Sequence, residues 1–411
     1  MLDAIPSLYE HKNKWLTGTN ILLAINFGLF AAMTVTGVSP GLPTSADLLR
    51  WGADYGPDTL GGQYWRLVTS CFVHIGLVHL AVNMYSLRLL GKAAEKLFRP
   101  AEIIAVYLLT GVGGSILSLS WNPNRVSAGA SGALFGIIGV LASVLYKNPL
   151  GLEPAVRQRL FSHVSKLALF NLLLGLMNGI DNMAHMGGLV TGLILGYFVA
   201  RGISASPEQR RFGSINLTAV SLVILAVTTA AVAKSKSYLV YLNRGIEASR
   251  QEDCNASVEY VRKYLQTRPP HDDAGNTLSA HSTLAYCLHK QNKISEAEQE
   301  YNAVLDTDPR NRWARVNLAT LKLGRDDTRA AGLFEEVLAS SKLDANEYRA
   351  YGKALAGMHR WADAEIALRK SLELAPNDPE THAQLADVLA AEGKLKESAK
   401  ETILAAHKEE E

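Results

Sequence analysis

The chain has 411 residues and a formal net charge of +2 at pH 7. Its length exceeds what one ordinary core holds, so two or more domains are expected. The small net charge points to no particular partner and gives no indication of nucleic-acid binding. Cys71, Cys254 and Cys287 are too few and too scattered for a disulfide framework or a zinc site, so we expect neither a metal nor a cofactor.

Charge is distributed unevenly along the chain. Residues 1–233 hold 10 of the 39 acidic residues, and the remaining 178 residues hold 29. The first part therefore resembles a membrane-embedded protein and the second a water-soluble one. The N-terminus mixes acidic and basic residues before a long apolar run without an A-x-A site, which indicates a first spanning helix, not a cleaved signal peptide.

Seven apolar segments are long enough to cross a bilayer as helices, which takes about 20 residues each. They lie at roughly 20–38, 74–91, 101–120, 127–146, 164–180, 183–200 and 215–233. With the N-terminus in the cytoplasm, 13 Lys and Arg residues of the short flanking segments lie inside and three outside, within the first six crossings. The positive-inside rule favours this orientation, as expected in a bacterial inner membrane.

Segment 39–73 is long for a loop and rich in Gly, Pro and aromatic residues, including Trp51, Tyr55, Tyr64 and Trp65. Aromatic side chains of this kind favour the headgroup region. We therefore expect this loop to lie in the outer membrane interface.

From about residue 237 the pattern changes to helical repeats. Ala297-x3-Tyr301, Ala330-x3-Phe334 and Ala364-x3-Leu368 recur at intervals of 33 and 34 residues, and proline follows the first and third. This period resembles tetratricopeptide repeats, which stack into an α-solenoid with a concave binding surface. Residues 240–270 and 380–408 fit a weaker first repeat and a last one, and 269–279 is interpreted as a loop or insertion.

Polar residues occur near the outer ends of three predicted helices that run in the same direction. His79 and Asn83 lie in the second helix, Ser131 in the fourth and His185 in the sixth. Ser131 and His185 then sit roughly 5–6 Å below the outer ends of their helices, at about 1.5 Å per residue. We expect these groups to share one depth in the membrane.

The chemistry of these residue types assigns each a role. A serine becomes a nucleophile when a base takes its proton, and a neutral imidazole can do so. We therefore predict Ser131 as nucleophile and His185 as general base. The oxyanion formed by attack on an amide needs donors, which His79, Asn83 and the Ser131 backbone N–H can supply. Asp181 caps a helix and faces water, so a dyad is favoured over a triad.

Glycines flank both reactive side chains. Gly129, Gly132, Gly136 and Gly139 line the fourth predicted helix, and Gly188, Gly192 and Gly196 line the sixth. Small faces of this kind let membrane helices approach closely and bring Ser131 near His185. Gly129-x-Ser131 does not fit the α/β-hydrolase nucleophile elbow, because residue 133 is Ala and no strand–helix alternation surrounds it.

Taken together, these residues resemble the rhomboid intramembrane serine proteases over about 15–205. The resemblance rests on six helices, a membrane-lying first loop, Trp65-Arg66, His79-x3-Asn83, Gly129-x-Ser131-Gly132 and His185 followed by Gly188-x3-Gly192. It implies the roles given above, with Phe135 stacking on the catalytic histidine in place of a common tyrosine. Gln63 stands where glutamate is common, so loop contacts are expected to differ there. The seventh helix matches the six-plus-one subgroup.

The sequence therefore predicts an all-α protein: a polytopic membrane helical bundle followed by an α-solenoid. We expect a cytoplasmic segment 1–18, a catalytic membrane domain 19–205, a seventh spanning helix with its flanks at 206–236, and an extracytoplasmic repeat domain 237–411. The expected activity is cleavage of transmembrane-helix protein substrates in the lipid bilayer, near its outer face. The repeats are expected to bind a protein partner.

Two other functions compete with this interpretation. A catalytically silent rhomboid-like scaffold would present the repeat domain, but such proteins typically lack the serine or the histidine. A transporter would use His79, Asn83 and His185 as a proton or substrate path. That function needs polar groups that continue to the inner face, where the predicted helices are apolar.

Overall fold

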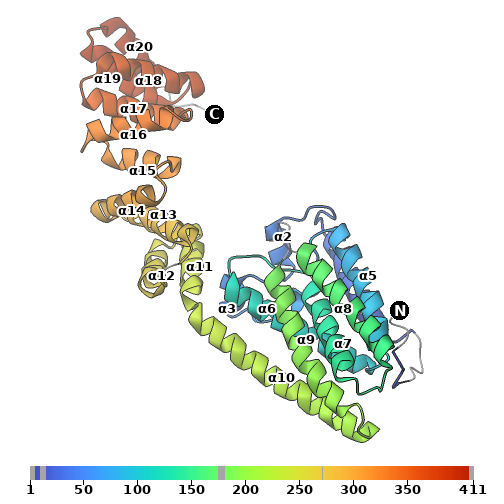
Figure 1. Cartoon of the computed structure of the whole chain (residues 1–411). Coiled ribbons are helices and arrows are strands. Elements are labelled where there is room, and N and C mark those ends of the chain that lie inside the picture. Colours follow the sequence, from blue (N-terminus) through green and yellow to red (C-terminus); the bar gives the residue numbers. More distant parts are fainter. Residues whose placement is uncertain (1–4, 10–14, 175–180, 271, 407–411) are drawn as a thin grey trace. The chain divides into compact units, whose positions relative to one another are not determined.

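The computed structural model describes residues 5–9, 15–174, 181–270 and 272–406. Within these ranges the regular secondary structure is helical, without a β-strand. An isolated antiparallel β-bridge joins Asp54 to Ser127. The chain divides into two compact units, Met1–Val240 and Tyr241–Glu411. The prediction of an all-helical membrane bundle followed by helical repeats is confirmed (Figure 1).

The first unit is a bundle of long helices whose packed faces share one apolar core. Leu22, Leu87, Tyr107 and Ile137 are among its fully buried members. The long helices are α1 (Gly18–Val35), α5 (Leu77–Ala94), α6 (Pro100–Trp121), α7 (Ser131–Lys147), α8 (Pro154–Leu174), α9 (Asn182–Gly202) and α10 (Pro207–Ser235). Short helices α2 (Ser45–Arg50), α3 (Gly56–Leu60) and α4 (Arg66–Thr69) lie between α1 and α5.

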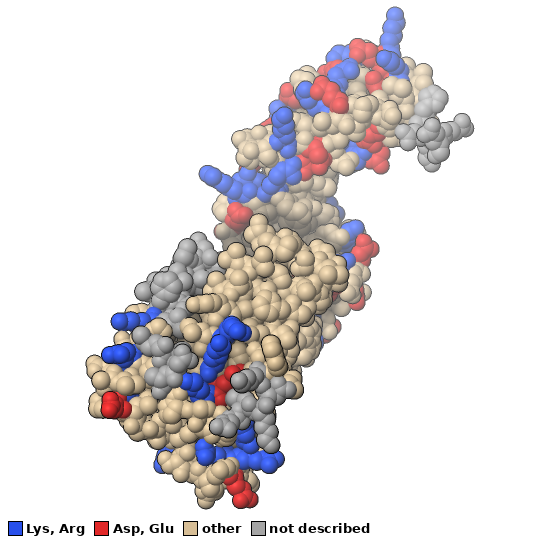
Figure 2. Space-filling view, turned by 90° about the vertical axis from the view of Figure 1, so that its right-hand side faces the viewer, with Lys and Arg blue, Asp and Glu red and all other residues tan. Residues whose placement is uncertain are grey.

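Four helices of the described residues, α1, α6, α9 and α10, are long and apolar enough to cross a membrane, and α7 is a shorter apolar helix. The predicted crossings at 74–91 and 164–180 correspond to α5 and α8. Neither helix meets the same length and composition criterion, and residues 175–180 lie outside the described part. On the face of the first unit shown in Figure 2, charged side chains gather toward one end and leave a broad uncharged surface.

Helices α7 and α9 meet backbone to backbone through their glycines. A Cβ atom on Gly188 would lie 1.9 Å from the Gly132 carbonyl oxygen, and one on Gly192 would lie 2.0 Å from that of Gly136. A Cβ on Gly196 would come within 2.7 Å of Val140. No side chain fits in these spaces, so glycine at these positions sets the distance between the two helices.

Arg66 anchors the segment between α1 and α5. Its Nη1 donates to the carbonyl oxygens of Leu49 at 2.7 Å and Ala53 at 2.9 Å, and its Nε donates to Gln63 Oε1 at 2.8 Å. The guanidinium also stacks on the Trp65 ring, 4.7 Å from its centroid. Arg66 is buried while half of Trp65 is exposed, so this pair fixes the loop and presents one aromatic face outward.

The second unit consists of successive antiparallel helix pairs. Its helices are α11 (Ser237–Arg250, which begins in the first unit), α12 (Cys254–Thr267), α13 (Ala274–Lys290), α14 (Ile294–Thr307), α15 (Arg312–Lys322), α16 (Asp327–Leu338), α17 (Ala345–Gly357), α18 (Trp361–Leu374), α19 (Pro379–Ala391) and α20 (Leu395–Ala406). Ala297, Ala330 and Ala364, the small residues of the predicted repeats, are fully buried where helices meet. Ion pairs such as Arg312–Glu347, at 2.5 Å, link neighbouring repeats.

One boundary in the second unit differs from expectation. The predicted loop 269–279 ends at Asp273, because the Asp273 side chain accepts from the Gly275 N–H and caps α13. Cys254 and Cys287 are free thiols that lie close enough for their side chains to hydrogen-bond.

Candidate active site

Ser131 is the first residue of α7, and the loop before it is shaped by Gly129. Gly129 has a φ of +130°, and its N–H donates to the Ser70 carbonyl oxygen at 2.8 Å. This turn begins α7 at Ser131 and not at the predicted 127. The Ser131 side chain therefore sits at the start of the helix, where backbone N–H groups are free of intrahelical partners.

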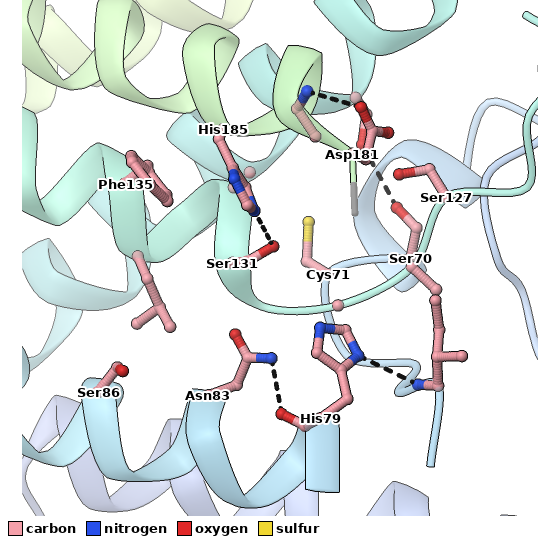
Figure 3. A pocket seen from close by; sticks show the side chains of 18 of the residues that line it. Ser70, Cys71, His79, Asn83, Ser86, Ser127, Ser131, Phe135, Asp181 and His185 are labelled. Carbon is pink, nitrogen blue, oxygen red and sulfur yellow. Dashed lines mark hydrogen bonds between the residues drawn. The ribbon is translucent and has the colours of Figure 1, made fainter. Parts of the chain in front are cut away.

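His185 faces Ser131 across the α7–α9 contact. Its Nε2 lies 2.9 Å from Ser131 Oγ, and its ring stacks on Phe135 with centroids 4.4 Å apart and an interplanar angle of 15° (Figure 3). The other ring nitrogen, Nδ1, is buried and has no hydrogen-bond partner among the described residues. The histidine is therefore positioned by an aromatic ring, and no carboxylate of the described residues hydrogen-bonds to its Nδ1.

Asp181 is occupied elsewhere. One carboxylate oxygen caps α9 by accepting from the Ala184 N–H at 3.0 Å, and the other accepts from Ser118 Oγ at 2.5 Å. Asp181 was expected to face water; its side chain is only partly exposed, because it packs against α6. The expectation that it caps the helix and does not complete a triad agrees with these contacts.

His79 and Asn83 line the same cavity from α5. The Ile75 N–H donates to His79 Nδ1 at 3.3 Å, so in the neutral ring Nε2 carries the proton and is a donor. The ring lies against Gly129, where a Cβ would be 2.5 Å from His79 Cε1. Asn83 Nδ2 donates to the His79 carbonyl oxygen at 2.8 Å, one turn back in its own helix, which leaves its second amide hydrogen for other partners.

These side chains surround one cavity of about 540 Å³. Figure 3 shows Ser131 and His185 on one side and His79 and Asn83 on the other. Val78 and Val82 of α5 also line the cavity and are largely exposed, so the cavity opens along that helix. The cavity wall includes Gly129, Gly132 and Phe135. Gly188 and Gly192 do not line the cavity and pack at the α7–α9 contact. Trp65 and Arg66 also lie outside the cavity.

Several residues that support the site were not predicted from the sequence. Asp54 pairs with Ser127 through two backbone hydrogen bonds of 2.8 and 2.9 Å, which tie the first loop to the segment leading into Ser131. The Ser70 backbone carbonyl oxygen accepts a hydrogen bond from the Gly129 N–H. Neither pairing could be predicted from the spacing of neighbouring residues, because each joins segments that are more than 50 residues apart in the sequence.

His74 precedes α5 and does not line the cavity. The cap position belongs to Gly76, and His74 is fully buried with its Nδ1 3.0 Å from the Phe72 carbonyl oxygen. Its ring lies 5.3 Å from that of His79, centroid to centroid. His74 thus packs behind His79.

The carboxyl group of Asp54, in the loop outside the spanning helices, is fully buried. Burial raises its pKa to about 7, against the opposing effect of a hydrogen bond of 2.6 Å from Thr59 Oγ1. Its second oxygen has no partner among the described residues. In the part of the chain that is described, no group of three or more His, Cys, Asp or Glu side chains could hold a metal ion.

The fold and site thus define an all-helical membrane protein with a serine–histidine pair beside a cavity. Residues 61–202 match the family model described as the rhomboid domain, a range that contains Ser131, His185, His79 and Asn83. This match, together with similar proteins named as rhomboid proteases, supports the rhomboid family.

Among curated proteins, the chain is 38% identical over 175 residues to RHOMBOID-like protein 6, mitochondrial, of Arabidopsis thaliana, covering 42% of this chain and 56% of that protein. It is 33% identical over 212 residues to the rhomboid protease GluP of Bacillus subtilis, covering 51% and 39%. The rhomboid protease AarA of Providencia stuartii is 27% identical over 233 residues, covering 51% and 80%. The chain spans about half the length of the first of these relatives.

Among solved structures, MamA from Desulfovibrio magneticus RS-1 matches with 18% identity and a TM-score of 0.37. The match covers 41% of this chain and 93% of that one. A match at this level says nothing about function.

Proposed function

We propose that this protein is a rhomboid-family intramembrane serine endopeptidase that cleaves transmembrane-helix substrates through a Ser131–His185 dyad. The observation that carries the proposal is the 2.9 Å contact between His185 Nε2 and Ser131 Oγ at the wall of a cavity. Nucleophile and base within hydrogen-bond reach are the signature of an activated serine.

The first half-reaction follows from the positions of these groups. His185 Nε2 takes the proton of Ser131 Oγ as the oxygen attacks the scissile carbonyl carbon, and the carbonyl oxygen becomes an oxyanion. The Ser131 backbone N–H, His79 Nε2–H and the second amide hydrogen of Asn83 are its donors. His185 then gives its proton to the leaving amine, and the acyl group remains on Ser131.

In the second half-reaction, water repeats these steps in place of the serine hydroxyl. His185 takes a proton from the water, the hydroxide attacks the acyl carbon, and Ser131 leaves with that proton. Phe135 keeps the imidazole in place through both halves, because its ring covers one face of His185. A stacked ring supplies orientation without charge, which is why a dyad suffices in this arrangement.

The cavity supports a substrate that enters from the lipid. Its wall on the α5 side carries Val78 and Val82, which are 79% and 53% exposed on the surface that would contact lipid. A substrate helix in the bilayer would reach Ser131 from that side. The peptide must be extended at the cut, because a helical backbone keeps its carbonyls in intrahelical hydrogen bonds.

We further propose a bacterial inner-membrane location with a cytoplasmic N-terminus. Helix α10 has 29 residues and is long and apolar enough to cross a membrane, which supports a seventh crossing. Residues 237–411 then form an extracytoplasmic repeat domain that binds a protein partner. A reporter fused after residue 240 should read as extracytoplasmic, and a cytoplasmic signal would refute the seventh crossing.

Labelling of the purified full-length chain with a fluorophosphonate probe tests the activity. We expect the native chain to be labelled and Ser131→Ala to be unlabelled. We expect His185→Ala to react at least 10³-fold more slowly, roughly the loss typical of removing a catalytic residue. Equal labelling of all three proteins would overturn the dyad. A folded native chain that takes up no label would favour the catalytically silent scaffold.

A further inference from the structure

A second cavity, of about 510 Å³, lies among α6, α9 and α10. Its α9 lining begins at Ile194 and ends at Gly202, whereas the candidate active site uses His185 on the same helix. The two cavities are therefore separated by about 13 Å or more along α9, at about 1.5 Å per residue. The second cavity takes no part in the proposed chemistry.

Polar side chains gather at one end of this cavity. Glu102 is held by Arg99 at 2.5 Å and also accepts from Ser214. Arg210 has no carboxylate partner among the described residues: its Nε and Nη1 are buried without a hydrogen bond, and its guanidinium lies 5.7 Å from the Tyr9 ring centroid. Arg210 is half-buried, and buried guanidinium nitrogens without an acceptor are costly, which favours an anion at this position.

The remainder of the lining is apolar and elongated. Along α10 it extends from Gln209 to Ile224, roughly 22 Å of helix. Leu109 and Leu195 form buried parts of the wall, and Ile194, Phe198, Val220 and Ile224 are at least half exposed on the outer side. One end is thus cationic and the long remainder apolar, with access from the surface that contacts lipid.

We propose that this cavity binds one anionic phospholipid, with the headgroup phosphate on Arg210 and an acyl chain along α6, α9 and α10. The guanidinium supplies paired N–H donors that suit a phosphate. An inorganic phosphate would gain nothing from the apolar wall, and an apolar peptide would leave Arg210 unpaired. A phospholipid satisfies both ends, and it is the solvent around these helices.

Glycine at position 213 provides a steric test. Gly213 lines the cavity, and a Cβ placed on it would meet no atom within 4 Å. Gly213→Phe should therefore fill the cavity without displacing the backbone, and it replaces a poor helix former by a better one. Arg211, the next residue after Arg210, is exposed and does not line the cavity, so Arg211→Gln is a charge-matched control.

The experiment is native mass spectrometry of the full-length chain in detergent with equimolar phosphatidylglycerol and phosphatidylcholine of the same acyl chains. We expect the native chain and Arg211→Gln to retain one phosphatidylglycerol. Arg210→Gln should retain about tenfold less, in line with loss of a charge-assisted hydrogen bond, and Gly213→Phe should retain neither lipid. Circular dichroism checks that each variant has native helix content.

Three results would each overturn the proposal. They are equal retention by Arg210→Gln and Arg211→Gln, unchanged retention by Gly213→Phe, and displacement of the lipid by millimolar inorganic phosphate. The last would show a free-phosphate site. Fluorophosphonate labelling of Ser131 is read separately, so failure of the protease proposal and failure of the lipid site are distinguishable.

Discussion

The two units of this protein bring helices together in different ways. At the α7–α9 contact, glycines place one backbone against the other, with Gly188 and Gly192 facing carbonyl oxygens. In the repeats, helices meet through side chains: Ala330, Phe334 and Tyr301 are fully buried. Both contacts are close-packed, but they use residues of opposite size.

The difference follows from the solvent of each unit. In water, burying a large apolar side chain removes it from solvent, so Phe334 and Tyr301 stabilise the repeats through the hydrophobic effect. In lipid that effect is absent between helices, and close backbone packing contributes instead. This contrast predicts that adding a methyl group is most harmful in the first unit and removing a ring is most harmful in the second.

The largest effect is expected for Gly192→Ala. The added Cβ would lie 2.0 Å from the Gly136 carbonyl oxygen, so α7 and α9 must separate. A displacement of about 1 Å at a catalytic pair can cost roughly 10²-fold in rate. We expect fluorophosphonate labelling of Ser131 to fall by about that factor or more. Gly28→Ala in α1, where a Cβ meets nothing within 4 Å, should leave labelling unchanged.

Phe334→Ala is expected to act on the second unit alone. Removing a fully buried Phe costs about 3–5 kcal/mol, which should raise hydrogen exchange across α15 and α16. Ile366→Ala, at a side chain that is 63% exposed, should change exchange little. Labelling of Ser131 should be native in both variants, and a loss of labelling in Phe334→Ala would refute the independence of the two units.

Much of this contrast could be predicted from the sequence, because both kinds of helix contact follow from residues that recur at regular intervals. The 33- and 34-residue spacing of Ala297, Ala330 and Ala364 predicts the repeats. The glycine stripes and the common direction of three helices predict that Ser131 and His185 meet. Helix geometry is regular, so residues tens of positions apart can be placed by counting turns.

Contacts made by loops could not be predicted in this way. The bridge between Asp54 and Ser127 and the approach of His79 to Gly129 depend on how segment 39–73 folds back on the loop before α7. Backbone turns such as the positive φ of Gly129 set those contacts, and no period in the sequence encodes them. The predicted loop 269–279 extends past the true start of α13. Pro269, Pro270 and Gly275 favour a loop, but the Asp273 side chain caps the helix that begins at Ala274.

The buried Asp54 predicts a pH dependence of stability in the first unit. Its pKa is raised to about 7 in the folded chain from 3.8, because burial disfavours the carboxylate. The folded state therefore keeps a proton that the unfolded state releases, and this contribution to stability is lost as pH rises from about 4 to 7. Asp54→Asn should raise the Tm at pH 8 and change it little at pH 4.

Asp47→Asn serves as the control, because Asp47 lies in the same loop with a partly exposed, hydrogen-bonded carboxyl group. Its pKa is lowered by hydrogen bonds from Thr44, so removing its charge should bring no gain in Tm at pH 8. An equal gain in both variants would refute the assignment to burial of Asp54.

The smallest effect, with the opposite sign, is expected at Glu365 in the second unit. A hydrogen bond from Lys394, joined by one from Arg369, lowers the pKa of Glu365 to about 2 from 4.5. This pairing stabilises the folded repeats above pH 4.5 and is lost as pH falls toward 2. Glu365→Gln should lower the Tm slightly at pH 7 and not at pH 2, since both partner side chains are over 40% exposed and water screens the pairs.

A pH scan of Asp54→Asn and Glu365→Gln therefore separates the two units by the sign of the response. The Asp54 carboxylate is destabilising when ionised, because it is buried without a countercharge. The Glu365 carboxylate is stabilising when ionised, because it is paired with cations. If both variants shifted the Tm in the same direction at pH 8, the contrast between a buried loop carboxyl and a solvated ion network would fail. Hydrogen exchange of segments 45–60 and 361–374 would assign each shift to its unit.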